Sequence, residues 1–194
     1  MDISFSIASE AHLIYTKELA EAYRISAQMR GTGIAMRKPE YLANKMRNGN
    51  AVIALDGGVV CGFCYIEIFS SEQYVSNSGL IVLPDYRGLG LSKKIKKEAF
   101  NLARDKYPSA KIFGITTSTI VMKINSDLGY RPVALTELTS DDEFWNSCSS
   151  CSNYDILERH NRKMCLCTGM LAESKDEMKT NLTHLIINDK EEKK

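Results

Sequence analysis

The stretch LPDYRGLGLSKK, from Leu83 to Lys94, decides the fold. It follows YVSNSGLIVL, a run typical of a strand, and precedes a segment with helical spacing of apolar residues, Ser92 to Lys106. A helix N-terminus has unpaired amide groups and a dipole that favours an anion. Gly88 and Gly90 have no side chain that would keep a phosphate from the backbone, and Arg87 and the lysines of the next turn add positive charge. The stretch predicts a phosphate-binding turn; a tight turn in which the glycines serve geometry alone is the alternative.

Two other phosphate-binding motifs do not match this stretch. A P-loop requires Lys and then Ser or Thr after its last glycine, whereas Leu91 and Ser92 follow Gly90 here. A dinucleotide fingerprint requires three glycines at the start of a parallel βαβ unit. This loop has two, and the strands before it are joined at Asp56-Gly57-Gly58, a strong hairpin signal.

Composition limits the class of protein. A chain of 194 residues fits one domain or one domain with an appendage, and a hydrophobic fraction of 44% can supply a core. Lys plus Arg is 25 and Asp plus Glu is 24, without the basic excess of most nucleic-acid-binding proteins. The one basic cluster, Lys93, Lys94, Lys96 and Lys97, is short. No apolar run reaches membrane-spanning length, and MDISFSIASE does not resemble a secretory signal. We therefore expect no nucleic-acid or membrane partner, a cytoplasmic location and reduced cysteines.

The patterns along the chain predict a strand, two helices, three strands, a helix, a strand, a helix and then further strands. The two first helices are expected at Glu10–Met29 and Pro39–Arg47, a late strand at RPVALTEL and the last one at KMCLCTGML. This order predicts an α+β (mixed α/β) fold with helices on a largely antiparallel sheet. We expect residues 1–140 to form the core, 141–173 a cysteine-rich extension that completes the sheet, and 174–194 a polar, frayed tail.

The segment LIVLPDYRGLGLSKKI resembles the acyl-coenzyme-A-binding motif of the GNAT superfamily of N-acetyltransferases. That motif is Arg or Gln, two residues, Gly, one residue and Gly or Ala, after a strand that ends in Val-x-Pro. Arg87 and Gly90 match it, and Ser92 takes the place of the small final residue. The predicted order of elements is similar to that fold as well, and the resemblance covers roughly Ile3 to Leu138.

By this resemblance the protein is an N-acyltransferase that uses acetyl-CoA or a related acyl-CoA, with a sheet splayed at the acyl-CoA site. The pyrophosphate of CoA would lie on the backbone amides of the glycine turn, which are those of Arg87, Gly88, Leu89, Gly90, Leu91 and Ser92. The pantetheine arm would pair with the strand around Leu80, Ile81 and Val82, splayed from the strand at Ile112–Thr116. Edge strands often make such proteins dimers, so a homodimer is plausible by analogy.

The catalytic residues of the family do not carry over directly. Acyl transfer needs a neutral amine, a polarised thioester carbonyl and a protonated leaving thiolate. Family members often have a Glu on the strand before the loop, where YVSNSGLIVL has none, and a Tyr and an Asn where Asn125 and Ser118 stand here. Glu67 is a candidate base through water, with a solvent-facing strand residue as the alternative. Asn125 and Ser118 are candidates to orient the thiolate or the pantetheine. Asn125 cannot act as an acid, so the thiolate would take its proton from water. Positioning of the reactants would then supply much of the catalysis.

The loop RGTGIAMRKPEYL is similar to a segment of amino-acid N-acetyltransferases of the N-acetylglutamate synthase type. By that similarity Arg30 and Arg37 are candidates for a bidentate clamp on a substrate carboxylate, which a planar guanidinium suits. Two arginines that merely solvate a helix junction are the alternative. The expected acceptor is a small-molecule amine that bears a carboxylate, with glutamate first. A peptide or protein acceptor and a non-catalytic acyl-CoA-binding module are the other hypotheses.

The region DDEFWNSCSSCSNYDILERHNRKMCLCTGML is unusual for such a protein. Cys148 and Cys151 have the spacing of a zinc-binding pair, and Cys165 and Cys167 lie two apart on a predicted strand and hence on one face. The four thiolates are candidate ligands of a structural zinc ion. Buried or free thiols are the alternative, because cysteine is common in protein cores. A stable disulfide is the third possibility, and a reducing compartment disfavours it.

Overall fold

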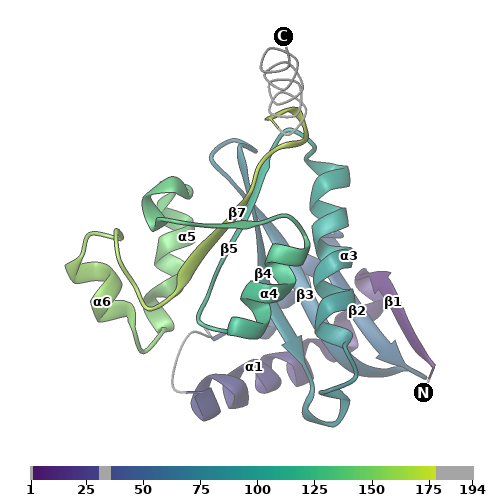
Figure 1. The fold of residues 1–194 in the computed structure, drawn as a ribbon. Helices are drawn as coiled ribbons and strands as arrows, with labels where there is room; N and C mark the ends of the chain where they lie inside the picture. Colours follow the sequence, from purple (N-terminus) through teal and green to yellow (C-terminus); the bar gives the residue numbers. More distant parts are fainter. Residues whose placement is uncertain (1, 31–35, 178–194) are drawn as a thin grey trace.

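The structure, a computed structural model, describes residues 2–30 and 36–177 of the chain. A seven-stranded sheet with the order β1-β2-β3-β4-β5-β7-β6 forms its centre (Figure 1). The strands are β1 (Ile3–Ile7), β2 (Ala51–Asp56), β3 (Val59–Phe69), β4 (Tyr74–Val82), β5 (Lys111–Thr116), β6 (Arg131–Val133) and β7 (Thr168–Ala172). All neighbouring strands pair antiparallel except β4 and β5, which are parallel. The predicted mixed fold with a largely antiparallel sheet is confirmed.

Helices cover both faces of the sheet. On one face α1 (Thr16–Arg30) and α2 (Pro39–Arg47) bury Leu19 and Leu42 against Phe63 of β3. On the other face α3 (Leu91–Lys106) buries Ile95 against Ile66 of the same strand, and α4 (Thr119–Asp127) lies beside α3 (Figure 1). Successive strand residues point to opposite faces, so one strand serves both cores. Among the described helices, none combines the length and the apolar character that a membrane crossing requires.

The C-terminal extension builds a third apolar cluster. It contains α5 (Asp142–Asn146), a 3-10 turn (Ser147–Ser150) and α6 (Tyr154–Arg159). Phe144 and Trp145 of α5 pack with Phe113 of β5 and Leu171 of β7. Phe113 and Leu171 alternate with strand residues that face α3, so the extension packs on the same side of the sheet as α1 and α2. The indole nitrogen of Trp145 donates to the carbonyl oxygen of Thr139 at 2.8 Å, so its polar atom is satisfied in the core.

Three predicted elements differ in extent. The helix expected from Glu10 begins as a 3-10 helix (Glu10–Tyr15), and α1 follows. The strand expected over RPVALTEL ends at Val133, and a 3-10 helix (Leu135–Glu137) follows. Leu135 and Leu138 are both buried, and because they are three residues apart, a 3-10 turn brings their side chains to the same side of the chain. The last strand begins at Thr168, so the prediction that Cys165 and Cys167 share a strand face is wrong. The predicted tail lies mostly outside the described residues.

Candidate active site

The two parallel strands β4 and β5 separate part-way along their length. They pair at three positions, of which Ser76 with Phe113 is the last, and β4 then continues without β5. Gly79 has a positive φ of 64°, and the register between β3 and β4 shifts nearby. A Cβ on Gly79 would lie 2.0 Å from the ring of Tyr65, so only glycine fits there. The hydroxyl of Tyr23 donates to the carbonyl oxygen of Gly79, which holds the bend against α1.

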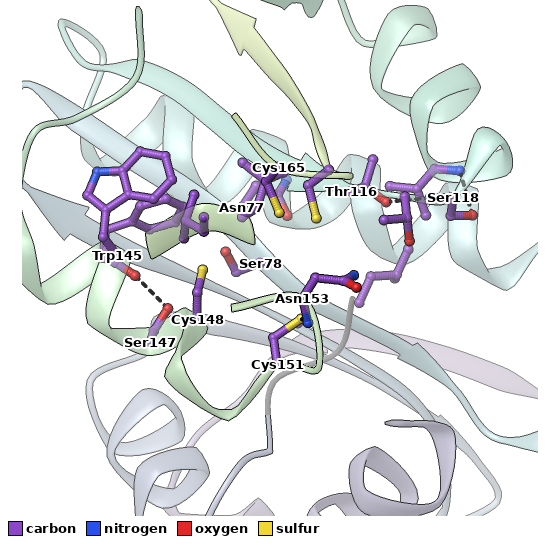
Figure 2. Close-up of a pocket in the computed structure, with 18 of the residues that line it drawn as sticks. Asn77, Ser78, Thr116, Ser118, Trp145, Ser147, Cys148, Cys151, Asn153 and Cys165 are labelled. Carbon is purple, nitrogen blue, oxygen red and sulfur yellow. Dashed lines mark hydrogen bonds between the residues drawn. The ribbon is translucent and has the colours of Figure 1, made fainter. Parts of the chain in front are cut away.

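A cavity of about 160 Å³ occupies this separation (Figure 2). Its walls come from both parted strands, both helical faces and the C-terminal extension. The lining residues are Tyr23, Arg37, Asn77, Ser78, Gly79, Leu80, Lys96, Ile115, Thr116, Thr117, Ser118, Val121, Leu135, Phe144, Trp145, Ser147, Cys148, Cys151, Asn153, Tyr154, Leu157, Cys165 and Cys167. This lining contains two cationic side chains, Arg37 and Lys96, and no Asp or Glu from the described part of the chain. The cavity therefore favours an anionic ligand.

The glycine turn leads directly from β4 into α3. Gly88 and Gly90 have positive φ angles of 82° and 75°, and Gly90 is the N-cap of α3. A Cβ on either glycine would meet no other atom within 4 Å, so the space above the turn is open. Both glycines are needed for backbone conformation, and both leave the approach to the first amides of the helix clear. The two interpretations of the turn, geometry and phosphate binding, are compatible.

The basic residues around the turn have separate tasks. The Arg87 Nε atom donates to the carbonyl oxygen of Val82 at 3.2 Å and so ties the turn to the end of β4. Lys93 pairs with Asp127 of α4 at 2.9 Å. Lys94 lies over the ring of Phe5. Their charges remain close to the N-terminus of α3.

The residues expected along the pantetheine arm lie at different depths. Leu80 and Ser118 line the cavity. Ile81 and Val82 are buried on opposite faces of the sheet. Ser118 is the N-cap of α4, and its hydroxyl accepts from the amide of Val121 at 3.4 Å. Asn125 is buried but does not line the cavity, and its Oδ1 atom has no partner within the described residues.

Arg37 is one of the two cationic residues that line the cavity. Its Nε atom donates to the hydroxyl of Tyr65 at 2.5 Å, and its guanidinium lies over the rings of Tyr41 and Tyr65. A guanidinium held in this way has lost much of its rotamer freedom before any ligand binds. Arg30 ends α1, and its side chain lies outside the described part of the chain. Arg37 therefore lies at the cavity, whereas the predicted pairing of Arg30 with Arg37 falls outside the described residues.

Glu67 lies on β3, outside the cavity lining. Its carboxylate pairs with the Lys45 ammonium of α2 at 2.5 Å, and both side chains are largely buried. Burial, together with the neighbouring Tyr65 and Glu67, raises the pKa of the Tyr41 hydroxyl, which thus stays protonated. Glu67 is therefore separated from the cavity by two tyrosines, and any action on a bound amine would pass through water or through these hydroxyl groups.

Lys96 and its partner Asn77, two polar residues in the parted region, were missed by sequence reasoning. Lys96 of α3 is 3% exposed, and its ammonium donates to the carbonyl oxygen of Asn77 at 2.6 Å. Burial lowers the pKa of Lys96, because a charged amine is disfavoured away from water. The periodicity of α3 contained the signal: Lys96 stands three residues before Ala99 and seven before Ala103, on the apolar stripe.

The four C-terminal cysteines all line the cavity. Figure 2 shows the side chains of Cys148 and Cys165 directed toward it. Burial, with a contribution from neighbouring thiols, raises the pKa of Cys148 to about 11 and that of Cys167 to about 12. All four are free thiols, and over residues 2–30 and 36–177 no three His, Cys, Asp or Glu side chains are arranged to hold a metal ion. The prediction of a structural zinc ion is therefore not supported. One reason is that Cys165 and Cys167 lie on irregular chain before β7 instead of side by side on a strand.

Solved structures with the same fold include several acetyltransferases. The N-acetylglutamate synthase from Neisseria gonorrhoeae, complexed with coenzyme A and N-acetyl-glutamate, matches 89% of this chain with a TM-score of 0.61 and 16% identity. This chain spans only 35% of that synthase. Rv2747 from Mycobacterium tuberculosis, in complex with CoA and NLQ, matches with a TM-score of 0.61, 15% identity and coverage of 88% of this chain and 98% of its own. A phosphinothricin acetyltransferase from Sinorhizobium meliloti, in complex with AcCoA, has a TM-score of 0.58, 17% identity and coverage of 88% of both chains. These identities show a shared fold alone.

A family model agrees with the fold. The model of the acetyltransferase (GNAT) family matches residues 16–118, which is more than half of the chain. Curated proteins gave no match. The matched segment runs from α1 through the parted strands and the glycine turn to the N-cap of α4, and so includes both parted strands of the cavity but not its C-terminal residues. The chain therefore belongs to the acetyltransferase (GNAT) family.

Proposed function

We propose that the protein transfers an acyl group, acetyl or succinyl, from acyl-CoA to the amino group of a small metabolite that bears a carboxylate, with glutamate as the first candidate. The observation that carries this proposal is the charge of the cavity. Its ionic side chains are Arg37 and Lys96, and no carboxylate of the described residues lines it. An acceptor with its own carboxylate would balance that charge.

The donor side fits acyl-CoA. The amides at the start of α3 and the open space above Gly88 and Gly90 suit a pyrophosphate, since an anion is favoured at a helix N-terminus. The unpaired edge of β4 beyond Ser76 offers backbone groups to an amide-containing arm such as pantetheine. Three proteins with this fold bind CoA or AcCoA in their solved structures. When bound, acyl-CoA supplies the activated thioester.

The acceptor side fits a small acid. We propose that Arg37 binds the acceptor carboxylate through its Nη atoms, because its Nε atom is already engaged with Tyr65. The Nη1 atom donates to the Met36 carbonyl oxygen at 3.2 Å in the free protein, and this weak bond can be exchanged for a charged one. The ring of Tyr65, whose hydroxyl binds Arg37, lies against Gly79, and the proposed clamp would therefore act beside the bent strand.

The C-terminal extension favours a small acceptor over a polypeptide. Trp145, Cys148, Asn153 and Cys165 line the cavity together with the parted strands, and these side chains restrict the space that is open to a polypeptide. We propose that residues 141–167 act as a specificity-determining cap on the core of the protein. Asn125 is set back from the cavity, and Glu67 is ion-paired outside it, so we propose that water near the acceptor takes up the proton released by the amine.

A thiol-release assay tests this function. Acetyl-CoA and succinyl-CoA are each offered with the twenty amino acids, and CoA release is measured for the wild type and for Arg37→Ala. We expect turnover with an acidic amino acid that largely disappears in the variant, while acetyl-CoA still binds. Turnover that is confined to peptides or basic amines, or that is unchanged in Arg37→Ala, would refute the acceptor assignment.

A further inference from the structure

Lys96 is a buried cation at the point where the sheet divides. It is 3% exposed, and over the described residues its ammonium has one hydrogen-bond acceptor, the carbonyl oxygen of Asn77 at 2.6 Å, and no carboxylate within ion-pairing distance. A buried amine without a counter-ion is strongly destabilising, so proteins seldom retain one without a functional reason. A neutral side chain would satisfy a single carbonyl group equally well.

The backbone around Lys96 explains its place. The ladder between β4 and β5 ends at Ser76 and Phe113, and Asn77 is the next residue of β4. Its carbonyl oxygen points toward β5, since a Cβ on Gly114 of β5 would lie 3.4 Å from it. The Lys96 ammonium thus replaces the strand amide that would have bound this oxygen. The side chain reaches from α3 into the division between the strands, and it lines the cavity.

The side-chain amide of Asn77 connects α3 to β3 and so helps to hold Lys96 in position. Its Nδ2 atom donates to the backbone carbonyl of Lys96 at 3.4 Å, and its Oδ1 atom accepts from the Cys64 thiol of β3 at 3.1 Å. The titratable groups that face Lys96 and its partner are the Cys64 thiol and the Tyr130 hydroxyl, and burial raises the pKa of both. Both are therefore neutral around pH 7, and neither balances the ammonium charge.

One other candidate proton donor near the bent strand is occupied. The hydroxyl proton of Tyr23 is held by the carbonyl oxygen of Gly79. The position at which family members often carry a tyrosine is Asn125, which has no acidic proton and lies outside the lining. Lys96 has two N–H groups left after its bond to Asn77, and it is one of the residues that line the cavity.

We propose that Lys96 is a catalytic residue that donates a proton to the sulfur of CoA as the acyl group leaves. This inference rests on the proposed function, in which acyl-CoA is the donor. The acceptor nitrogen forms a bond to the carbonyl carbon, the carbon–sulfur bond breaks, and its electron pair passes to sulfur. Sulfur takes the proton of the Lys96 ammonium, and the neutral amine regains a proton from water, which receives the one that the acceptor nitrogen loses. The products are the amide and the free thiol of CoA.

The chemistry of a buried lysine suits this role. An ordinary ammonium is a weaker acid than an ordinary thiol, so it would not transfer its proton to a thiolate. Burial lowers the pKa of Lys96 and makes the ammonium a better donor. After transfer both lysine and sulfur are neutral, and two neutral groups are favoured in a site shielded from water.

The first experiment needs no acceptor. The protein is labelled with ¹³C at lysine Cε, and Lys96 is titrated by NMR in the free protein, with CoA and with desulfo-CoA, which lacks the sulfur atom. We expect CoA to shift the Lys96 titration and desulfo-CoA to leave it closer to that of the free protein. Identical titrations with the two ligands would show that Lys96 does not contact sulfur and would overturn the proposal.

The second experiment uses Lys96→Met and Lys96→Arg, with Lys97→Met as a matched control, because Lys97 is exposed on the same helix and does not line the cavity. We expect Lys96→Met to lower kcat by roughly 100-fold or more with little change in the KM of the acceptor. Lys96→Arg should also lose activity, because a guanidinium does not release its proton. Full activity in either Lys96 variant would overturn the proposal. Unchanged turnover of the acidic acceptor in Arg37→Ala, with the expected behaviour of both Lys96 variants, would refute the acceptor assignment alone.

Discussion

The Arg37 guanidinium donates to the Tyr65 hydroxyl at 2.5 Å, and the ring of Tyr65 occupies the space that a side chain at Gly79 would need. The arginine comes from the chain just before α2, the tyrosine from β3 and the glycine from the bend in β4. One aromatic ring therefore connects the proposed acceptor clamp to the strand where the sheet divides. A substitution at any one of these three positions should therefore alter the local structure at the other two.

We expect Arg37→Lys to raise the KM of a carboxylate-bearing acceptor by roughly 10- to 100-fold, the range of one lost charged hydrogen bond. Lysine keeps the charge, but it lacks the planar fork whose Nε atom binds Tyr65 while the Nη atoms face a carboxylate, and it loses the stacking on Tyr41. Steady-state kinetics with varied acceptor measure the effect. The acyl-CoA KM should stay near the wild-type value, and an equal rise in both constants would argue against a clamp.

Gly79→Ala should be strongly destabilising. The added Cβ would lie 2.0 Å from Tyr65, and the positive φ of 64° adds backbone strain. We expect a loss of about 2–4 kcal/mol in the free energy of unfolding, measured with urea. Gly58→Ala in the hairpin is the control, because it has a positive φ and no atom within 4 Å of the new Cβ. Equal losses in the two variants would show that Tyr65 can move away.

Gly90→Ala separates a structural role of the glycine turn from ligand binding. Gly90 and Gly58 both have positive φ angles and open surroundings, so both alanine variants should lose about 1–2 kcal/mol of stability. Only Gly90→Ala should also weaken acetyl-CoA binding, because a side chain there obstructs the amides of α3. Isothermal titration calorimetry gives the affinities. Unchanged CoA affinity in Gly90→Ala would contradict the assignment of this turn to the pyrophosphate.

Cys148 should react slowly with iodoacetamide near pH 8. Only the thiolate reacts, and burial raises the pKa of this thiol from 9.0 to about 11, a difference of two units. The thiolate fraction is then about 100-fold lower than in an ordinary cysteine. Mass spectrometry of alkylated peptides follows each site, and the urea-unfolded protein gives the ordinary rate. A native rate close to the unfolded one would contradict the burial of this thiol.

The same raised pKa affects stability at high pH. Protonated Cys148 and Cys167 contribute stability that is fully present below the unfolded-state pKa of about 9. This contribution is lost as the pH rises toward about 11 and 12, because the unfolded chain gives up these protons first. Cys148→Ser with Cys167→Ser should therefore show a smaller fall in unfolding free energy between pH 8 and 10.5 than the wild type. Parallel curves for the two proteins would refute this account.

Local patterns were sufficient for much of the fold. The strand-like runs at β1 to β5, the hairpin at Asp56-Gly57-Gly58 and the glycine turn before α3 depend on neighbouring residues, and all were predicted near their observed places. Patterns failed where elements are short. The strand β6 has three residues, and α5 and α6 have five and six, so their apolar residues show no period of their own. Those segments are held by packing against Phe113 and Leu171.

The sequence by itself determined the family, the mixed fold and the glycine turn before α3, because each depends on residues close together in the chain. Only the tertiary structure decided which side chains meet. It brought Arg37 to the cavity and left Glu67 paired with Lys45 outside it. Lys96 is one member of a basic cluster in the sequence, and in the folded protein it is buried and donates a hydrogen bond to the Asn77 carbonyl oxygen. The tertiary structure also placed the C-terminal cysteines around the cavity without a metal-binding geometry among the described residues. The physical reason is that burial and charge pairing are set by contacts between distant segments, which a pattern of neighbours does not contain.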